Sequence, residues 1–413
     1  MLQERGVNIV PSYEAADWLV INTCAFIRDA KEESIAEALE AFEKKEEGEI
    51  RHVAVMGCLP ERYTEELKEN FKEADIVWGV NDMEELADLI ANDRSGDYQK
   101  HDLFLYTDEH KRIITTTPNT TFIKISEGCN MQCTFCAIPQ IRGPYRSRDT
   151  ESIIKEAKLY HNLGFSELNL ISQNSTYYGK DRQKKSELPH LLEELSKIGF
   201  TWIRVLYLMP EEVDEEIIEA FHHPSILPYF DLPFQHVSAN VLKAMKRSGS
   251  PKSKLELIAR IRDRFPNAVI RSTFIVGFPG ETQEEFEELV EFAKQAKIER
   301  IGAFSYSPEE ETEAFQYKET IAEDVAAERR ELLMDISDLN METFNETLLD
   351  TTQQFLPLGP CPWDAEATIG RIACQAPEVD GVTIIPGKFD DSFEIFDIKI
   401  TGFENEILHG ERL

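Results

Sequence analysis

The segment Gly128-Cys129-Asn-Met-Gln-Cys133-Thr-Phe-Cys136 lies just after residues 121–126, which we expect to form a strand. Three thiolates at this spacing on one loop can bind three corners of a cubane iron–sulfur cluster. The fourth iron is then left open, and an open metal position is where a substrate binds. Zinc is the alternative, but a structural zinc site takes four ligands and no nearby His or Cys completes the set. The segment therefore predicts a [4Fe–4S] cluster with catalytic chemistry.

The strand before the cysteines is the first of six that alternate with helices over residues 118–340. We expect these strands at residues 121–126, 167–171, 202–207, 229–232, 268–276 and 301–304. Helical segments such as 151–161 and 283–295 separate most of them. Six parallel βα units with right-handed crossovers curl into an open barrel, so the pattern predicts a partial (β/α)6 barrel in an α/β protein.

Residues 1–117 form a second region, in which short apolar runs at 18–22 and 52–56 end at turn residues, as buried parallel strands do. Between them, residues 29–47 predict a helix with an acidic first turn and lysines near its end. This region predicts a Rossmann-like α/β domain. Leu2–Gly6 is typical of a helix end with its C-terminal glycine, and the polar residues 93–117 suit a linker.

In the third region, residues 345–413, helical periodicity stops and short alternating runs such as 392–400 predict strands of a small β-barrel. A chain of 413 residues is too long for one hydrophobic core, which agrees with three domains. No stretch approaches the roughly 20 apolar residues of a membrane span, and the N-terminus has no signal-peptide pattern. We therefore expect a cytoplasmic protein, in which seven cysteines indicate metal or redox chemistry rather than disulfides.

The cysteine triplet, with the aromatic Phe135 before its last cysteine, resembles the signature of the radical S-adenosylmethionine (SAM) superfamily. The resemblance implies that SAM chelates the open iron, that Phe135 packs near the adenine, and that reductive cleavage of SAM yields a 5′-deoxyadenosyl radical. Candidates for shaping the SAM pocket follow the predicted strands, at the rim where barrel enzymes keep their chemistry: Gln173, Gln235, Gly277 and Glu281. Each alone could equally be an ordinary loop residue.

Arg204 lies on the third predicted strand of the barrel. It could bind the SAM carboxylate bidentately. A surface or interdomain ion pair is an equally good interpretation.

Longer motifs resemble the methylthiotransferases, a family within that superfamily. They are Ser126-Glu-Gly-Cys-Asn130, Cys136-Ala-Ile-Pro-Gln-Ile-Arg-Gly-Pro-Tyr-Arg-Ser-Arg148, Leu232-Pro-Phe-Gln-His236, Ile275-Val-Gly-Phe-Pro-Gly-Glu-Thr282, Phe304-Ser-Tyr-Ser-Pro-Glu309, Asn22-Thr-Cys24-Ala-Phe-Ile-Arg-Asp-Ala-Lys-Glu-Glu-Ser34 and Gly57-Cys58-Leu59. The resemblance spans nearly the whole chain. It implies that a second [4Fe–4S] cluster supports sulfur insertion, that one SAM supplies the methyl group and that another supplies the radical.

Three cysteines of the N-terminal domain hold that second cluster in the family, and Cys24 and Cys58 match two of them. Without the family, two such cysteines after strands would more often be packing residues. The first family cysteine is expected upstream of Met1. We therefore expect the second cluster to lack a ligand in this chain, with full sulfur insertion impaired. Cys361 and Cys374 match no family ligand.

Members of the family act either on tRNA adenosines or, in the RimO type, on an aspartate β-carbon of a basic small-subunit ribosomal protein, and both types end in a TRAM β-barrel. The net charge is −33, and residues 345–413 carry 13 acidic against four basic residues. Such a surface repels tRNA and attracts a cationic protein. Residues 370–382 also resemble the RimO version, whereas Asn174 stands where that type has aspartate.

We therefore expect methylthiolation of the ribosomal protein, with an electron donor such as flavodoxin or ferredoxin and no membrane partner. The alternatives are methylthiolation of a tRNA adenosine and a catalytically impaired binder of the ribosomal protein.

Overall fold

The computed structural model describes residues 1–97, 103–115, 118–389 and 393–413. The chain packs into two compact units. The first consists of residues 1–111, 127–146 and 307–317, and the second of residues 112–126, 147–306 and 318–413. Two segments far along the chain thus belong to the N-terminal unit, and one of them carries the cysteine triplet. Within the expected linker 93–117, residues 98–102 and 116–117 lie outside the described residues.

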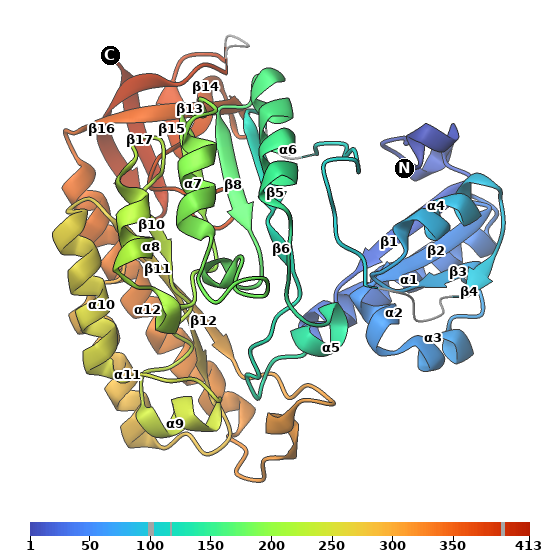
Figure 1. The fold of residues 1–413 in the computed structure, drawn as a ribbon, viewed down its shortest axis with the longest axis horizontal. Helices are drawn as coiled ribbons and strands as arrows, with labels where there is room; N and C mark the ends of the chain where they lie inside the picture. Colours follow the sequence, from blue (N-terminus) through green and yellow to red (C-terminus); the bar gives the residue numbers. More distant parts are fainter. Residues whose placement is uncertain (98–102, 116–117, 390–392) are drawn as a thin grey trace. The chain divides into compact units, whose positions relative to one another are not determined.

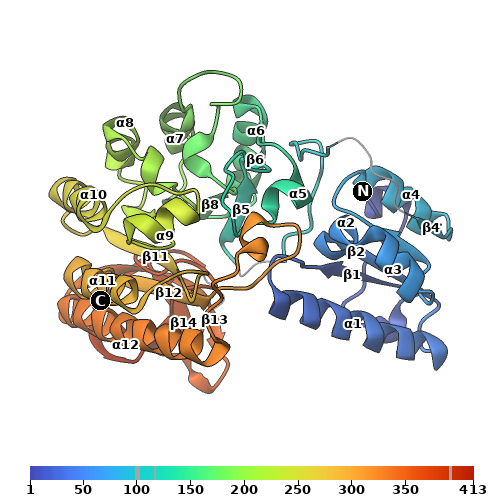
Figure 2. The ribbon, with the colours of Figure 1, turned by 90° about the horizontal axis from the view of Figure 1, so that it is seen from below.

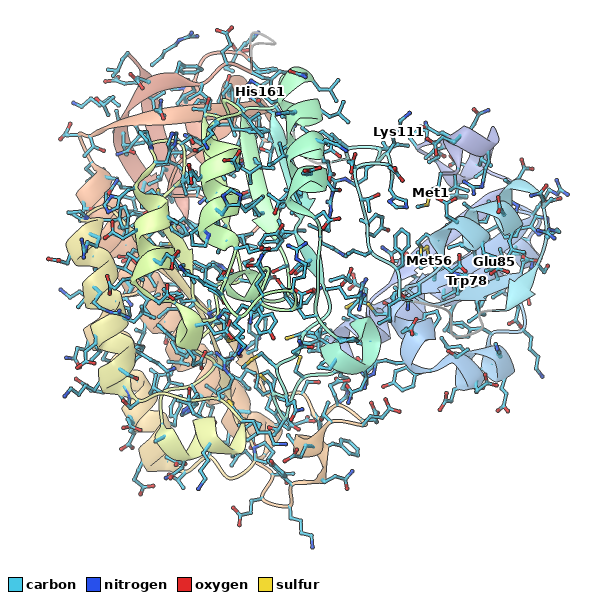
Figure 3. All side chains as sticks on the ribbon, in the orientation of Figure 1. Met1, Met56, Trp78, Glu85, Lys111 and His161 are labelled. Atoms are coloured by element: carbon cyan, nitrogen blue, oxygen red, sulfur yellow. The ribbon has the colours of Figure 1, made fainter. Side chains whose placement is uncertain are left out.

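The first unit is built on a parallel sheet with the strand order β1-β2-β3-β4 (Figure 1). Its strands are β1 (Trp18–Thr23), β2 (His52–Gly57), β3 (Ile76–Trp78) and β4 (Gly96–Asp97). Its helices are α1 (Arg28–Glu46), α2 (Cys58–Arg62), α3 (Thr64–Asn70) and α4 (Met83–Ala91). The expected strands at 18–22 and 52–56 and the helix at 29–47 are confirmed to within a residue. Figure 3 labels Met56 and Trp78, register partners on the neighbouring strands β2 and β3.

Gly6 ends a single short turn, η1 (Gln3–Arg5), in the left-handed conformation with φ of 81°. A glycine adopts this conformation at little cost. The expected C-terminal glycine is therefore confirmed.

In the second unit, parallel strands lie inside a ring of helices (Figure 2). The strands are β5 (Thr120–Lys124), β8 (Glu167–Ile171), β9 (Trp202–Val205), β10 (Tyr229–Asp231), β11 (Val269–Val276) and β12 (Arg300–Ser305). The longer helices of the ring are α6 (Thr150–Asn162), α7 (Leu188–Ser196), α10 (Pro251–Arg264), α11 (Gln283–Ala296) and α12 (Glu323–Leu348). A bridge between Ile203 and Ile226 links the β5-β8-β9 sheet to the segment that leads into the β10-β11-β12 sheet. All six predicted barrel strands are confirmed to within two residues at each end.

The two faces of the barrel strands have different chemistry. Alternate residues pack with the helices in the main hydrophobic core, for example Leu168, Ile203, Phe230, Ile270 and Ile301. Because successive side chains on a strand point to opposite faces, the residues between them face the barrel interior. These inward residues include the charged side chains of β8 to β12, which are Glu167, Arg204, Asp231, Arg271 and Arg300.

A closed barrel with the strand order β13-β14-β15-β17-β16 ends the chain. Its strands are β13 (Thr352–Cys361), β14 (Asp364–Ile372), β15 (Thr383–Pro386), β16 (Phe396–Glu404) and β17 (Ile407–Arg412). Leu356 and Ala376 of this barrel pack on Trp202 and Tyr229 of the central one, and so close its amino end. Of the predicted strand at 392–400, Ser392 lies outside the described residues, and β16 begins at Phe396.

Strand β13 contains prolines that a central strand normally excludes. Its pairing with β14 shifts register between Pro357 and Gly359 and again between Pro360 and Cys361. Bulges of this kind accommodate residues that lack a backbone N–H. The proline-rich sequence therefore forms a bulged strand of the closed barrel. Among the described residues, no helix is both long and apolar enough to cross a membrane.

Candidate cluster-binding site

The cysteine loop is closed at its base by a short pair of strands, β6 (Ser126–Glu127) and β7 (Arg146–Ser147). Gly128 has a φ of 80°, and a Cβ there would collide with the carbonyl oxygens of Gly143 and Pro144. Glycine is therefore required where the two ends of the loop approach each other. The amide of Cys129 donates to the oxygen of Gly143 at 3.1 Å, which fixes the first cysteine at this crossing.

Backbone hydrogen bonds also shape the rest of the loop. The amide of Cys136 donates to the oxygen of Cys133 at 3.1 Å, and the amide of Met131 donates to Sγ of Cys129 at 3.4 Å. Cys129 is buried, whereas Cys133 and Cys136 are half-buried. Helix α5 (Ile138–Arg142) follows at once. The loop thus presents three thiols from eight consecutive residues.

Three thiols on one loop are the donors that a cubane cluster takes. Within the described part of the chain, no three His, Cys, Asp or Glu side chains converge on one ion-sized point. A cubane gives each thiolate its own iron, and amide hydrogen bonds to sulfur such as that of Met131 tune these clusters. Cys129, Cys133 and Cys136 therefore fit the predicted [4Fe–4S] cluster.

Cys24 and Cys58 stand side by side in the first unit. Thr23 and Gly57 are register partners at the ends of the parallel strands β1 and β2, and each cysteine is the next residue. Neighbouring strands lie about 4.8 Å apart, so the two cysteines follow adjacent strand ends. Ser34 of α1 holds the backbone of Cys24 by hydrogen bonds to its amide (2.9 Å) and its oxygen (3.1 Å).

A guanidinium connects this pair of cysteines to the cysteine loop. Nη2 of Arg142, at the end of α5, donates to Sγ of Cys58 at 3.3 Å, and Nη1 lies 3.6 Å from Glu127. Burial lowers the pKa of Arg142, but the attraction of Cys58 and Glu127 outweighs it and raises that pKa overall. Arg142 lies within one of the family-like motifs, but no local pattern in the sequence indicates this contact.

At the rim of the central barrel, the candidate residues have separate environments. Gln173 lies two residues after the end of β8 and is half-buried. Gln235 has a φ of 66° and bridges to β11, since its amide donates to Thr273 and its oxygen accepts from Ile275. Phe135, on the cysteine loop, is half-buried.

Gly277 and Glu281 order the loop after β11. A Cβ on Gly277 would lie 2.5 Å from Cβ of Ala326 on α12. The buried carboxylate of Glu281 accepts from the amide of Phe278 at 3.1 Å and pairs with Arg329 at 2.9 Å. In this structure the Glu281 carboxylate therefore shapes the loop itself.

The sequence left two roles open for Arg204, binding of the SAM carboxylate or an interdomain ion pair. In the structure, Arg204 forms the ion pair. Its side chain is fully buried, lies 3.5 Å from Glu167 and donates to the backbone oxygen of Ala373 in the C-terminal barrel. Arg371 of that barrel binds the same Glu167. Burial raises the pKa of Glu167, but Arg371 and Arg204 outweigh it and hold that pKa below its ordinary value. The position of Arg204 therefore corrects its assignment to the SAM pocket.

Comparison with known proteins identifies the family to which the chain belongs. Residues 123–293 match the radical SAM superfamily, and residues 1–79 match the uncharacterized protein family UPF0004. The ribosomal protein uS12 methylthiotransferase RimO of Thermosipho africanus is 39% identical over 417 residues, covering 99% of this chain and 94% of the relative. The RimO of Aquifex aeolicus is 42% identical, covering 97% and 89%. The chain belongs to the RimO family of radical SAM methylthiotransferases.

A solved structure supports the fold. The radical SAM methyltransferase TsrM of Kitasatospora setae superposes with a TM-score of 0.54 at 14% identity, covering 71% of this chain and 65% of that one. The predicted family and the α/β fold class are thus confirmed. Membership in the superfamily implies one [4Fe–4S] cluster and SAM, which agrees with the chemistry of the cysteine loop.

Asn174, which departs from the RimO pattern, has a local structural explanation. Its Oδ1 accepts from the amide of Tyr177 at 3.2 Å and caps the short turn η3 (Ser175–Tyr177). Its Nδ2 lies 3.3 Å from the carboxylate of Glu212. An aspartate could cap the turn, but it would place a second negative charge beside Glu212. The asparagine side chain therefore has a structural role at this position, between the turn and Glu212.

Proposed function

We propose that this chain transfers a methylthio group to the β-carbon of an aspartate in ribosomal protein uS12. The observation that carries the proposal is the near full-length likeness to uS12 methylthiotransferases, in a chain whose cysteine loop is built to hold a [4Fe–4S] cluster. We divide the chain into an N-terminal domain (1–117), a radical SAM core (118–340) and a TRAM domain (345–413). A donor such as flavodoxin or ferredoxin supplies the electron.

The proposed roles of the residues follow their positions. Cys129, Cys133 and Cys136 hold the cluster that, when bound, supplies the electron for cleaving SAM. Cys24 and Cys58 hold part of a second cluster, and their matched positions on β1 and β2 support this assignment. Among the rim residues, Gln235 fixes the β10 and β11 loops by backbone hydrogen bonds and so shapes the SAM pocket.

Charge favours a protein substrate over a nucleic acid. The chain has a net charge of −33, and the proposed TRAM domain has 13 acidic residues against four basic ones. Binding to tRNA requires cations that neutralise phosphates, whereas an acidic surface accelerates encounter with a basic protein. The proposed substrate is a basic ribosomal protein, so the charges are complementary.

The test is a reaction with both substrate classes in one vessel. The protein is reconstituted anaerobically with iron and sulfide, then mixed with reductant, SAM, purified uS12 and tRNA. We expect tandem mass spectrometry to place one methylthio group on an aspartate of uS12. Methylthioadenosine in the tRNA with unmodified uS12 would contradict the proposal. Binding of uS12 without formation of 5′-deoxyadenosine would also contradict the proposal. The chain would then be a protein that binds uS12 without modifying it.

A matched pair of variants controls the reaction. Cys136→Ala removes a cysteine of the loop, whereas Cys361→Ala removes a buried cysteine of the C-terminal barrel that belongs to neither cluster site. We expect modification of uS12 to be lost in the first variant and kept in the second.

A further inference from the structure

The ion pairs of the inward-facing strand residues in the central barrel contain more arginines than carboxylates, although the chain as a whole is strongly acidic. Four arginines meet three carboxylates there. Glu167 is shared by Arg204 and Arg371, Asp231 pairs with Arg271, and Asp380 lies 3.7 Å from Arg300. All of these residues belong to the second unit. These interior residues thus carry one more positive than negative charge, which favours an anionic over a cationic ligand.

Of the four arginine side chains, that of Arg271 is the most exposed. Its side chain is 21% exposed, whereas Arg204, Arg300 and Arg371 are 7% exposed or less. Arg271 is on the inward face of β11, because Ile270 on one side and Phe274 further along pack with the helices instead. The Arg271 side chain therefore faces the barrel interior and is less buried than the arginines that contact the C-terminal barrel.

Asp231 binds Arg271 through a single hydrogen bond between their side chains. Nη1 of Arg271 donates to Oδ1 of Asp231 at 3.2 Å, while Oδ2 of the same carboxylate accepts from the amide of Tyr207 at 3.0 Å. Among the described residues, Asp231 is the one hydrogen-bonding partner of the Arg271 side chain. A guanidinium has five N–H donors in a planar fork that matches a carboxylate. Donors therefore remain for a second carboxylate.

The interior face of β11 leads from Arg271 toward the rim. The next inward residues are Thr273 and Ile275, and both are half-buried rather than sealed. Neither carries a charge that would repel an acidic side chain. A carboxylate that enters from the carboxyl ends of the strands thus meets Arg271 as the first cation along β11.

We propose that Arg271 binds the carboxylate of the aspartate that this enzyme modifies, with Asp231 as its positioning residue. The inference rests on the proposed function and adds the group that recognises the substrate side chain. Modification at the β-carbon leaves the carboxylate intact, so the same contact serves substrate and product. An asparagine at the same place lacks the charge and cannot form the bidentate pair.

The experiment measures binding of two basic peptides from the uS12 loop, one with the aspartate and one with asparagine in its place, to the reconstituted protein. We expect the parent to prefer the aspartyl peptide. Arg271→Gln should raise the Kd of that peptide by about 10- to 100-fold, the effect of one charge-assisted hydrogen-bonded pair. The asparaginyl peptide should bind equally to both proteins. Arg271→Lys keeps the charge but not the fork, and should recover part of the preference.

Controls separate the possible failures. Arg260→Gln removes a guanidinium that pairs with Glu215 on the outer helices, and should leave the preference intact. The SAM carboxylate is the other carboxylate that Arg271 could serve. Loss of SAM affinity in Arg271→Gln with an unchanged peptide preference would overturn the proposal. An unchanged preference with unchanged SAM affinity would overturn it as well. A parent that binds neither peptide would contradict the proposed function itself.

Discussion

The cysteine loop and the amino end of the central barrel are built in opposite ways. The loop takes its functional groups from eight consecutive residues, and backbone hydrogen bonds hold it to Gly143 nearby and to Ala314 further along the chain. The amino end of the barrel takes its charges from strands and from a C-terminal barrel some two hundred residues away, and holds them by buried ion pairs such as Glu167 with Arg371. The cluster-binding groups therefore come from one short segment, whereas the residues that stabilise the barrel end come from segments far apart in the sequence.

The largest expected effect tests whether the loop carries the chemistry alone. Cys136→Ala should reduce 5′-deoxyadenosine formation by at least about 10³-fold, since the three ligands act as a unit. Bound iron should fall by about four atoms per chain. The midpoint of chemical unfolding of the protein without clusters should remain unchanged, because neighbouring backbone hydrogen bonds hold the loop. A large loss of stability would mean that the loop is part of the structural core.

The second prediction concerns the barrel end. Glu167→Gln leaves Arg371 and Arg204 buried without their shared carboxylate, and should lower the free energy of unfolding by about 3–5 kcal/mol. Glu193→Gln, in an exposed pair with Lys197, is the control and should cost less than about 1 kcal/mol. Chemical denaturation measures both. Similar small losses in the two variants would remove the contrast between the regions.

Gly128→Ala should disturb the loop alone. The new methyl group meets the carbonyl oxygens of Gly143 and Pro144 at a positive φ, so the loop base must open. We expect a cost of about 1–3 kcal/mol, confined to the loop. Iron incorporation should fall, while hydrogen exchange of β8 and β11 should stay as in the parent. Faster exchange throughout the barrel would show that the loop and the barrel are not independent.

The smallest expected effect is a pH-dependent contribution of Glu310, in the first unit, to the free energy of unfolding. Hydrogen bonds from Lys31 and Tyr63 lower the pKa of Glu310 to about 2. A carboxyl with a lowered folded pKa stabilises the protein above its ordinary pKa, and this contribution disappears as the pH falls toward 2. Glu310→Gln should therefore be less stable than the parent at neutral pH, with a difference that vanishes between about pH 4.5 and 2. A difference that does not change with pH would contradict the assignment.

The same contrast explains what could be predicted from sequence. Alternation and apolar runs located the barrel strands because burial on two faces leaves a local pattern. The cysteine loop was predictable for the same reason, since its ligands lie within one short segment. The role of Arg204 was not, because its partners Glu167 and Ala373 meet it only in the folded protein. Strand β3 is three residues long and leaves too short a pattern to detect.

The charges of Asp231 and Arg271 are visible in the sequence, but hydrophobic periodicity alone does not predict that they pair. Each interrupts an apolar strand with a charge, and a buried charge in a strand requires a partner. Register then decides the pairing, since the two residues lie opposite each other on β10 and β11. Opposite charges in apolar strands of one predicted barrel are therefore candidates for an interior pair.

The most direct test of the central claim uses the double variant Cys24→Ala/Cys58→Ala, in which the cysteine loop is the remaining cluster site. After anaerobic reconstitution and reduction, electron paramagnetic resonance is measured before and after SAM is added. We predict about four irons per chain and a [4Fe–4S] signal that shifts on SAM binding, as an open iron requires. A chain that binds no cluster, or a cluster signal that SAM does not change, would contradict the assignment of Cys129, Cys133 and Cys136.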